Sequence, residues 1–121
     1  MIELNHKETQ MKFEILLSVL FELLAKRKVT ASYLAKKHKI SNRTVHRYVD
    51  ILSLTVPIET ARGRNGGIQI VTDYALPMGF MTEAEYTAAL EALDLAYEQS
   101  GEEKFLAAKL KLTAQRIAET K

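Results

Sequence analysis

Five polar side chains lie close together between residues 42 and 47, and their chemistry suits nucleic acid. They are Asn42, Arg43, Thr44, His46 and Arg47. A guanidinium can bind a guanine edge or a phosphate, an amide can pair with adenine, and threonine can contact a phosphate or a thymine methyl. Each residue also has an alternative role without nucleic acid. Asn42 could simply stabilise the start of a helix, and Arg43 and Arg47 could pair with acids such as Asp50.

A helix beginning at Ser41 would carry these side chains on one face. Val45, Val49 and Leu52 recur at i, i+4 and i+7, which predicts a helix over about Ser41–Leu54 with this stripe toward the core. Base contacts usually come from the N-terminal part of a helix in the major groove. Ser41 is a good N-cap, and an exposed helix N-terminus can bind phosphate through its N–H groups.

The segment before Ser41 predicts two further helices. Apolar residues at helical spacing predict an amphipathic helix from about Gln10 to Lys26. Thr30 is a suitable N-cap for a short helix to about His38, with Tyr33 and Leu34 facing inward, and its N-terminus is a second candidate phosphate contact. Two short helices joined by a tight turn at Lys39-Ile40 are the helix-turn-helix layout.

A basic hairpin is predicted directly after the third helix. The strands are expected at Val56–Ala61 and Ile68–Val71. The tip between them, residues 62–67, reads RGRNGG, in which Gly and Asn would supply positive φ angles. Arg62, Arg64 and Asn65 would reach a nucleic-acid backbone or minor groove. The glycines do not have the spacing of a nucleotide-binding loop, and no catalytic motif is present, so no enzyme activity is expected.

Two helices are predicted after a connector at residues 72–80. Thr82 and Glu85 form a capping box that opens a helix to about Gln99, and a last helix covers about Glu102–Glu119. The last helix has two apolar seams, so a second subunit is expected to cover part of this hairpin. The candidate dimerisation residues are Tyr86, Leu90, Leu93, Tyr97, Phe105, Leu106, Leu110, Leu112 and Ile117. The alternative is that the last helix folds back onto the first.

Composition limits the remaining possibilities. The 121 residues are 47% hydrophobic with no cysteine, so a core can form without disulfides or thiolate metal sites, and no His spacing fits zinc. No cofactor or metal is therefore expected. The polar start and the lack of a long apolar run predict a cytoplasmic, nucleoid-associated protein rather than a secreted or membrane protein.

Charge is unevenly distributed along the chain. Residues 26–64 hold ten basic and two acidic residues, a net charge of +8, whereas residues 74–121 hold five basic and eight acidic residues, a net charge of −3. This suggests a polyanion-binding part, residues 1–73, and a linker with a helical hairpin, residues 74–121. Chance clustering on a solvated surface is the alternative.

The wording of these segments resembles a known family. Residues 29–35 (VTASYLA), 40–52 (ISNRTVHRYVDIL), 56–58 (VPI), 63–70 (GRNGGIQI), 74–77 (YALP) and 81–85 (MTEAE) are similar to DeoR-like winged-helix domains. The nearest resemblance is to the N-terminal domains of WYL-type bacterial transcriptional regulators, over about Met11–Ala96. It implies a mainly α fold with a small β-hairpin, a winged helix-turn-helix followed by two helices, and sequence-specific binding of double-stranded DNA by a homodimer.

Two features depart from that pattern. His46 and Tyr48 stand where these regulators commonly have Tyr and Asp, so typical base contacts do not carry over to them. The chain ends where a WYL sensor domain would begin, so an effector cannot be carried over either, and the chain is expected to be a fragment or a small stand-alone regulator. Other functions remain open at this point: a winged-helix protein-interaction adaptor, or a DNA-binding protein of plasmid or phage maintenance.

Overall fold

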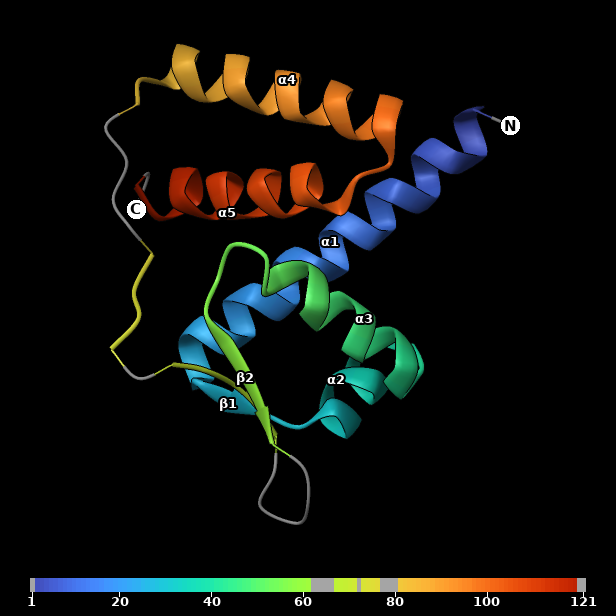
Figure 1. The fold of residues 1–121 in the computed structure, drawn as a ribbon, viewed down its shortest axis with the longest axis vertical. Helices are drawn as coiled ribbons and strands as arrows, with labels where there is room; N and C mark the ends of the chain where they lie inside the picture. The colour runs from blue at the N-terminus through green and yellow to red at the C-terminus, as the bar shows by residue number, and fades with distance from the viewer. Residues whose placement is uncertain (1, 62–66, 72, 77–80, 120–121) are drawn as a thin grey trace.

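The computed structural model describes residues 2–61, 67–71, 73–76 and 81–119. In these ranges it has five helices and one small antiparallel sheet (Figure 1). The order is α1 (Ile2–Lys26), β1 (Lys28–Val29), α2 (Ala31–His38), α3 (Asn42–Leu52), β2 (Ile58–Ala61), β3 (Gly67–Ile70), α4 (Glu83–Ser100) and α5 (Glu103–Glu119). This confirms the predicted winged helix-turn-helix followed by two helices. No helix of the described part is long and apolar enough to cross a membrane.

Helix α1 is longer than its apolar pattern predicts. It begins at Ile2, whereas the periodicity places its start near Gln10. Its described buried side chains, such as Leu16, Leu20 and Leu23, lie in the second half of the helix. The earlier turns have no apolar residues at helical spacing but are rich in good helix formers, so the apolar pattern alone could not place the start of the helix.

Local signals position α2 and α3. The Thr30 hydroxyl accepts a hydrogen bond from the Tyr33 N–H at 3.0 Å, and Ser41 Oγ accepts one from the Thr44 N–H at 3.0 Å, so both predicted N-caps are present. Between the helices Lys39 adopts a left-handed conformation with φ 57°. This conformation ends α2 and turns the chain sharply into α3.

The sheet has the strand order β1-β3-β2. Lys28 and Val29 pair with Gln69 and Ile68. β1 was not predicted, because two residues have no detectable period and are strands only through this distant pairing. The predicted start of β2 at Val56 is wrong. The Val56 N–H donates to the Leu52 carbonyl, so this buried residue belongs to the turn that follows α3.

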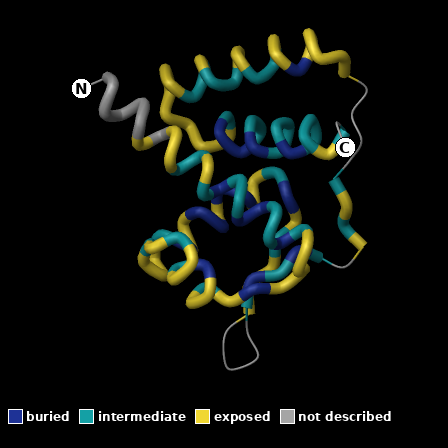
Figure 2. The backbone as a smooth tube through the Cα atoms, turned by 180° about the vertical axis from the view of Figure 1, so that it is seen from behind, coloured by how far each residue is buried: buried dark blue, intermediate teal, exposed yellow. Residues whose placement is uncertain are grey.

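One core joins the first and last parts of the chain. Leu16, Leu20 and Leu23 of α1 share a buried cluster with Ile68 and Ile70 of the sheet. The α5 residues Leu106, Ala107, Leu110 and Ala114 belong to the same cluster, and none is more than 1% exposed. Figure 2 shows the buried side of α5 turned toward the lower part of the molecule, with α4 outside it. The last helix therefore folds back onto α1, as one alternative had it, and it also packs against α3.

Polar contacts stabilise the start of α4 and join α4 to α5. The predicted capping box is present at the start of α4, where Thr82 and Glu85 exchange side chain–backbone hydrogen bonds. Arg116 Nη2 lies 2.8 Å from Glu83 Oε1. The Tyr86 hydroxyl donates to the Glu119 carboxylate, and this hydrogen bond, together with burial, raises the pKa of Tyr86 to about 12. The hairpin therefore has its own fixed geometry.

Candidate nucleic-acid interface

Helix α3 has one buried face and one polar face. Val45, Val49 and Leu52 are at most 2% exposed and pack in the core. Tyr48 joins them on the buried side, where burial raises the pKa of its hydroxyl. The side chains on the other face are exposed: Asn42, Arg43, His46, Arg47 and Asp50. The packing thus holds the predicted polar residues at the surface of a rigid helix.

The two arginines of α3 keep their charges available. Within the described residues, neither Arg43 nor Arg47 forms an ion pair, although Asp50 is exposed on the same helix. The described contacts therefore do not support the alternative that they serve only to pair with acids. Five N–H donors on each guanidinium can form bidentate contacts with a phosphate or a guanine edge.

The start of α3 combines a cap with a second hydroxyl. Ser41 Oγ accepts from the Thr44 N–H and also donates to Thr44 Oγ1 at 3.0 Å. Thr44 is half-buried, whereas Ser41 and Asn42 are exposed. The Thr44 hydroxyl therefore helps to fix the first turn. Uncapped N–H groups and the positive end of the helix dipole make such a turn favourable for an anion.

Comparison with known proteins agrees with this geometry. Residues 16–69 match the family model of the HTH domain. The matched segment contains the helix-turn-helix unit of α2 and α3, and we call it the helix-turn-helix domain. A relative from Bacillus subtilis (strain 168), named "Uncharacterized HTH-type transcriptional regulator YobV", is 35% identical over 92 residues, which are 73% of this chain and 29% of that protein. The chain therefore spans less than a third of this relative's length. No solved structure matches the chain.

A cluster around Glu22 brings together α1 and α2 of the helix-turn-helix domain. The Glu22 carboxylate contacts Lys37 Nζ, lies 3.4 Å from Lys26 Nζ and accepts a hydrogen bond from the Tyr33 hydroxyl at 3.1 Å. Lys26 Nζ is also 4.4 Å from the centre of the Tyr33 ring. The expectation that Tyr33 faces inward is wrong, because these contacts hold it at the surface with 38% exposure.

This cluster lowers the charge available to a polyanion. Lys26 and Lys37 are two of the ten basic residues in the +8 segment, and both are paired with a glutamate that lies just before that segment. Sequence reasoning missed this, because Glu22 and Lys37 come together only when α1 packs beside α2. His38 adds little charge, since burial, helped by the neighbouring Lys37, lowers its pKa.

The predicted wing of the helix-turn-helix domain falls largely outside the described residues. Arg62, Arg64 and Asn65 lie there, so their roles stay predictions. Gly67 is described, and its assignment to the hairpin tip is wrong: it is the first residue of β3, with no positive φ. Its reason for being glycine is space. A Cβ here would lie 3.0 Å from the Val29 carbonyl oxygen.

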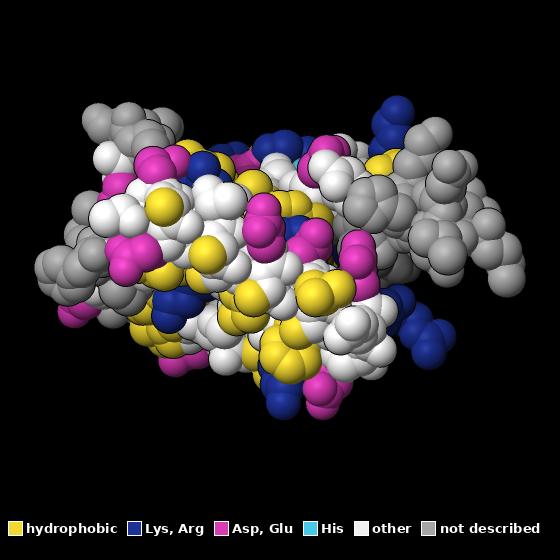
Figure 3. Space-filling model, turned by 90° about the horizontal axis from the view of Figure 1, so that it is seen from above, with side chains coloured by type: hydrophobic (Ala, Val, Ile, Leu, Met, Phe, Trp, Pro, Cys, Tyr) yellow, Lys and Arg dark blue, Asp and Glu magenta, His cyan; other side chains and the backbone are white. Residues whose placement is uncertain are grey.

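The surface of α4 differs in charge from the helix-turn-helix domain. Figure 3 shows this side of the molecule, where acidic side chains alternate with hydrophobic ones. Its exposed acids include Glu85, Glu91 and Glu98, and Leu95 between them is 54% exposed. In Figure 1, α4 lies at the opposite end of the molecule from the ends of β2 and β3 that border residues 62–66. Such an acidic surface repels a polyanion, so α4 is not part of the candidate nucleic-acid interface.

The predicted dimerisation residues fall into two groups. Tyr86, Leu106 and Leu110 are at most 2% exposed within the single chain, so they contribute to its own packing. The others are half-buried: Leu90, Leu93, Tyr97, Phe105, Leu112 and Ile117. No group of acidic or histidine side chains that could hold a metal occurs in the described part of the chain.

Proposed function

We propose that this chain is a sequence-specific DNA-binding transcriptional regulator whose helix α3 enters the major groove. The observation that carries the proposal is the α3 surface, where Arg43 and Arg47 stand exposed and without ion pairs among the described residues beside Asn42 and His46. The matched HTH domain and the regulator named for the Bacillus subtilis relative support it. The resemblance to DeoR-like domains of WYL-type regulators points to the same class.

In this proposal each element has a separate task. Arg43 and Asn42 near the helix start read base edges, Arg47 one turn later binds a base edge or phosphate, and Ser41 and Thr30 present helix N-termini to the backbone. The wing residues Arg62, Arg64 and Asn65 contact the backbone or the minor groove. The acidic α4 surface faces away from DNA.

A salt titration tests DNA binding directly. Fluorescence anisotropy with labelled random duplex DNA is expected to show affinity falling linearly on a log–log plot, with a slope of about −0.9 per phosphate neutralised. Selection from a random pool should then enrich one defined sequence. Salt-independent or undetectable binding would overturn the proposal in favour of a protein-interaction adaptor, and salt-dependent binding with no enriched sequence would remove its sequence-specific part.

We also propose that the chain acts as a homodimer joined through the outer surface of α4. Leu95 is exposed there, and α4 contacts mainly α5, so its outer side lacks cover within the described chain. A two-fold dimer would present two α3 helices to half-sites about one helical turn apart. The selected DNA sequence would then be an inverted repeat.

Light scattering after size exclusion tests the dimer. Wild type is expected at twice the chain mass of 13.7 kDa. Leu95→Glu, which places a charge in the interface but does not touch the monomer core, is expected at the monomer mass. Ser32→Glu is a control on the exposed surface of α2, outside α4, and is expected to remain dimeric. A monomeric wild type, or a Leu95→Glu variant that stays dimeric, would rule out this interface.

A further inference from the structure

The side chain of Lys28 lies across Gly67 on the exposed face of the sheet. β1 and β3 are antiparallel, with Lys28 opposite Gln69, so Gly67 is the diagonal neighbour two residues along β3. A Cβ at position 67 would lie 3.1 Å from Lys28 Cε and 3.5 Å from its Cγ. The aliphatic stem of Lys28 therefore occupies the space that a side chain at position 67 would need.

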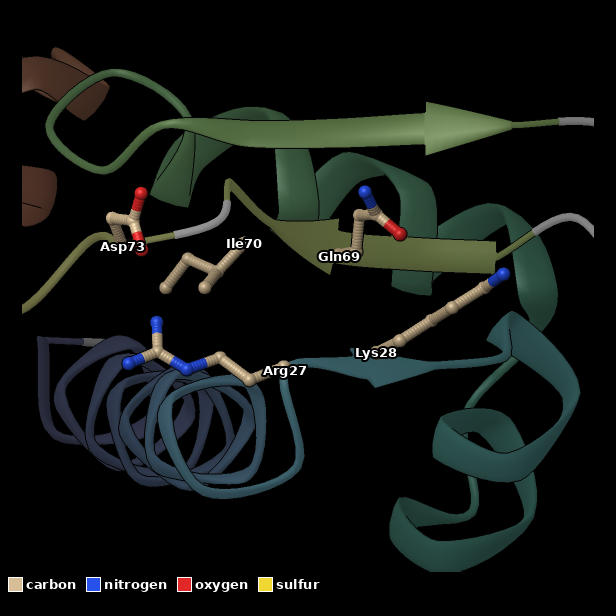
Figure 4. A pocket seen from close by; sticks show the side chains of 5 residues that line it. All are labelled: Arg27, Lys28, Gln69, Ile70 and Asp73. Carbon is tan, nitrogen blue, oxygen red and sulfur yellow. The ribbon is translucent and has the colours of Figure 1, made fainter.

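This path directs the ammonium group toward one end of the sheet. In Figure 4 the Lys28 side chain runs along the sheet toward the end of β3 that begins at Gly67. Residues 62–66, the predicted wing, join β2 to β3 at that end. Thr30, the cap of α2, follows Lys28 by two residues. The path of the side chain therefore places the ammonium group at the end of the sheet next to two elements proposed to bind the DNA backbone, the wing and the N-terminus of α2.

Arg27, the neighbouring cation, takes the opposite direction. Its Nη1 donates to the Tyr74 carbonyl at 2.5 Å, which fastens the segment after β3 to the end of α1. The two side chains diverge along the same pocket of about 360 Å³, lined by Arg27, Lys28, Gln69, Ile70 and Asp73 (Figure 4). Arg27 therefore binds the segment that follows β3, whereas the Lys28 side chain runs toward the end of the sheet at Gly67 (Figure 4).

We propose that Lys28 is a DNA-backbone-binding residue, positioned by the passage of its stem over Gly67. The inference rests on the proposed function and adds a contact between the wing and α2. Lysine binds phosphate as a compact point charge on a flexible stem. Holding that stem against the sheet lowers the conformational entropy lost on binding. The absence of a side chain at position 67 is what makes this path possible.

Anisotropy titrations of Lys28→Gln test the charge. Glutamine keeps the first two methylene groups of the stem and removes the charge, so the log–log salt slope is expected to become shallower by about 0.9, and affinity at 0.1 M salt to fall roughly five- to tenfold. The loss should be the same on selected and scrambled DNA, because a phosphate contact carries no sequence information. Lys28→Arg should keep the slope. Lys104→Gln, which removes a charge from α5, should change neither quantity.

A double-mutant cycle tests the positioning by Gly67. Gly67→Ala leaves every charge in place but puts a methyl group against the Lys28 stem and the Val29 carbonyl. It is expected to weaken binding severalfold with Lys28 present and to have little further effect in Lys28→Gln. Circular dichroism at the titration temperature verifies that each variant is folded. If Gly67→Ala weakens binding equally in both backgrounds, Gly67 does not act through Lys28.

The outcomes separate this inference from the proposed function. Wild type that fails to bind DNA would remove both. Wild type that binds with a steep salt slope, with Lys28→Gln showing the same slope, would remove the Lys28 contact and leave the proposed function intact. A Lys28→Gln loss confined to the selected sequence would also overturn the inference, since it would identify a base contact rather than a backbone contact.

Discussion

Replacing Arg47 by alanine is expected to weaken binding of the selected duplex by roughly 1–3 kcal/mol, about five- to 150-fold. Arg47 is exposed on α3 and forms no ion pair within the described residues, so its removal costs the fold little. Anisotropy titration on selected and scrambled duplexes measures the loss. A loss on the selected duplex alone would assign Arg47 to a base edge, and an equal loss on both would assign it to a phosphate.

The control for this experiment has to be chosen from the structure. Lys111 is a poor choice, because its Nζ donates to the Thr55 carbonyl at 2.9 Å and so supports the turn that follows α3. Lys104 is better, since its side chain is 65% exposed on α5. Lys104→Ala is expected to bind DNA as wild type does. If Arg47→Ala and Lys104→Ala lose affinity equally, α3 is not the docking helix.

Replacing Leu110 by alanine is expected to lower the free energy of unfolding of the whole described fold by about 2–5 kcal/mol. Leu110 is completely buried and belongs to the cluster that also contains Leu16 and Leu20 of α1 and Val49 of α3. Truncation leaves a cavity between the last helix and the helix-turn-helix domain. Urea unfolding followed by circular dichroism should show a single transition with a lower midpoint.

Leu54→Ala is the matched control for Leu110→Ala. Leu54 is 56% exposed in the turn that follows α3, outside the proposed dimer surface, so its truncation should change the unfolding free energy by no more than about 0.5 kcal/mol. The decisive alternative is a two-step unfolding curve for Leu110→Ala, in which α4 and α5 melt while DNA binding persists. That result would contradict a shared core and would make residues 74–121 a separate unit.

Much of the candidate site could be predicted because its signals are local. Thr30 and Ser41 cap helices through hydrogen bonds to residues three positions later, and Thr82 with Glu85 does the same. The two faces of α3 follow from the helical period alone. The early start of α1 was missed because residues 2–9 contain no apolar stripe in the sequence, and the strand position of Gly67 was missed because a glycine needed for space looks like a glycine needed for a turn.

The helix-turn-helix order, the caps and the set of polar residues on α3 follow from the amino-acid sequence alone, since each depends on neighbours within a turn or two. Which charges are paired, and where the charged side chains lie, depends on the packing of distant segments. Glu22 pairs with Lys26 and Lys37 because α1 packs on α2, and the pairing of β1 with β3 sets the direction of the Lys28 side chain. Helix α5 enters a core formed by residues that lie about sixty positions earlier in the chain. These contacts join distant segments, so no local pattern encodes them.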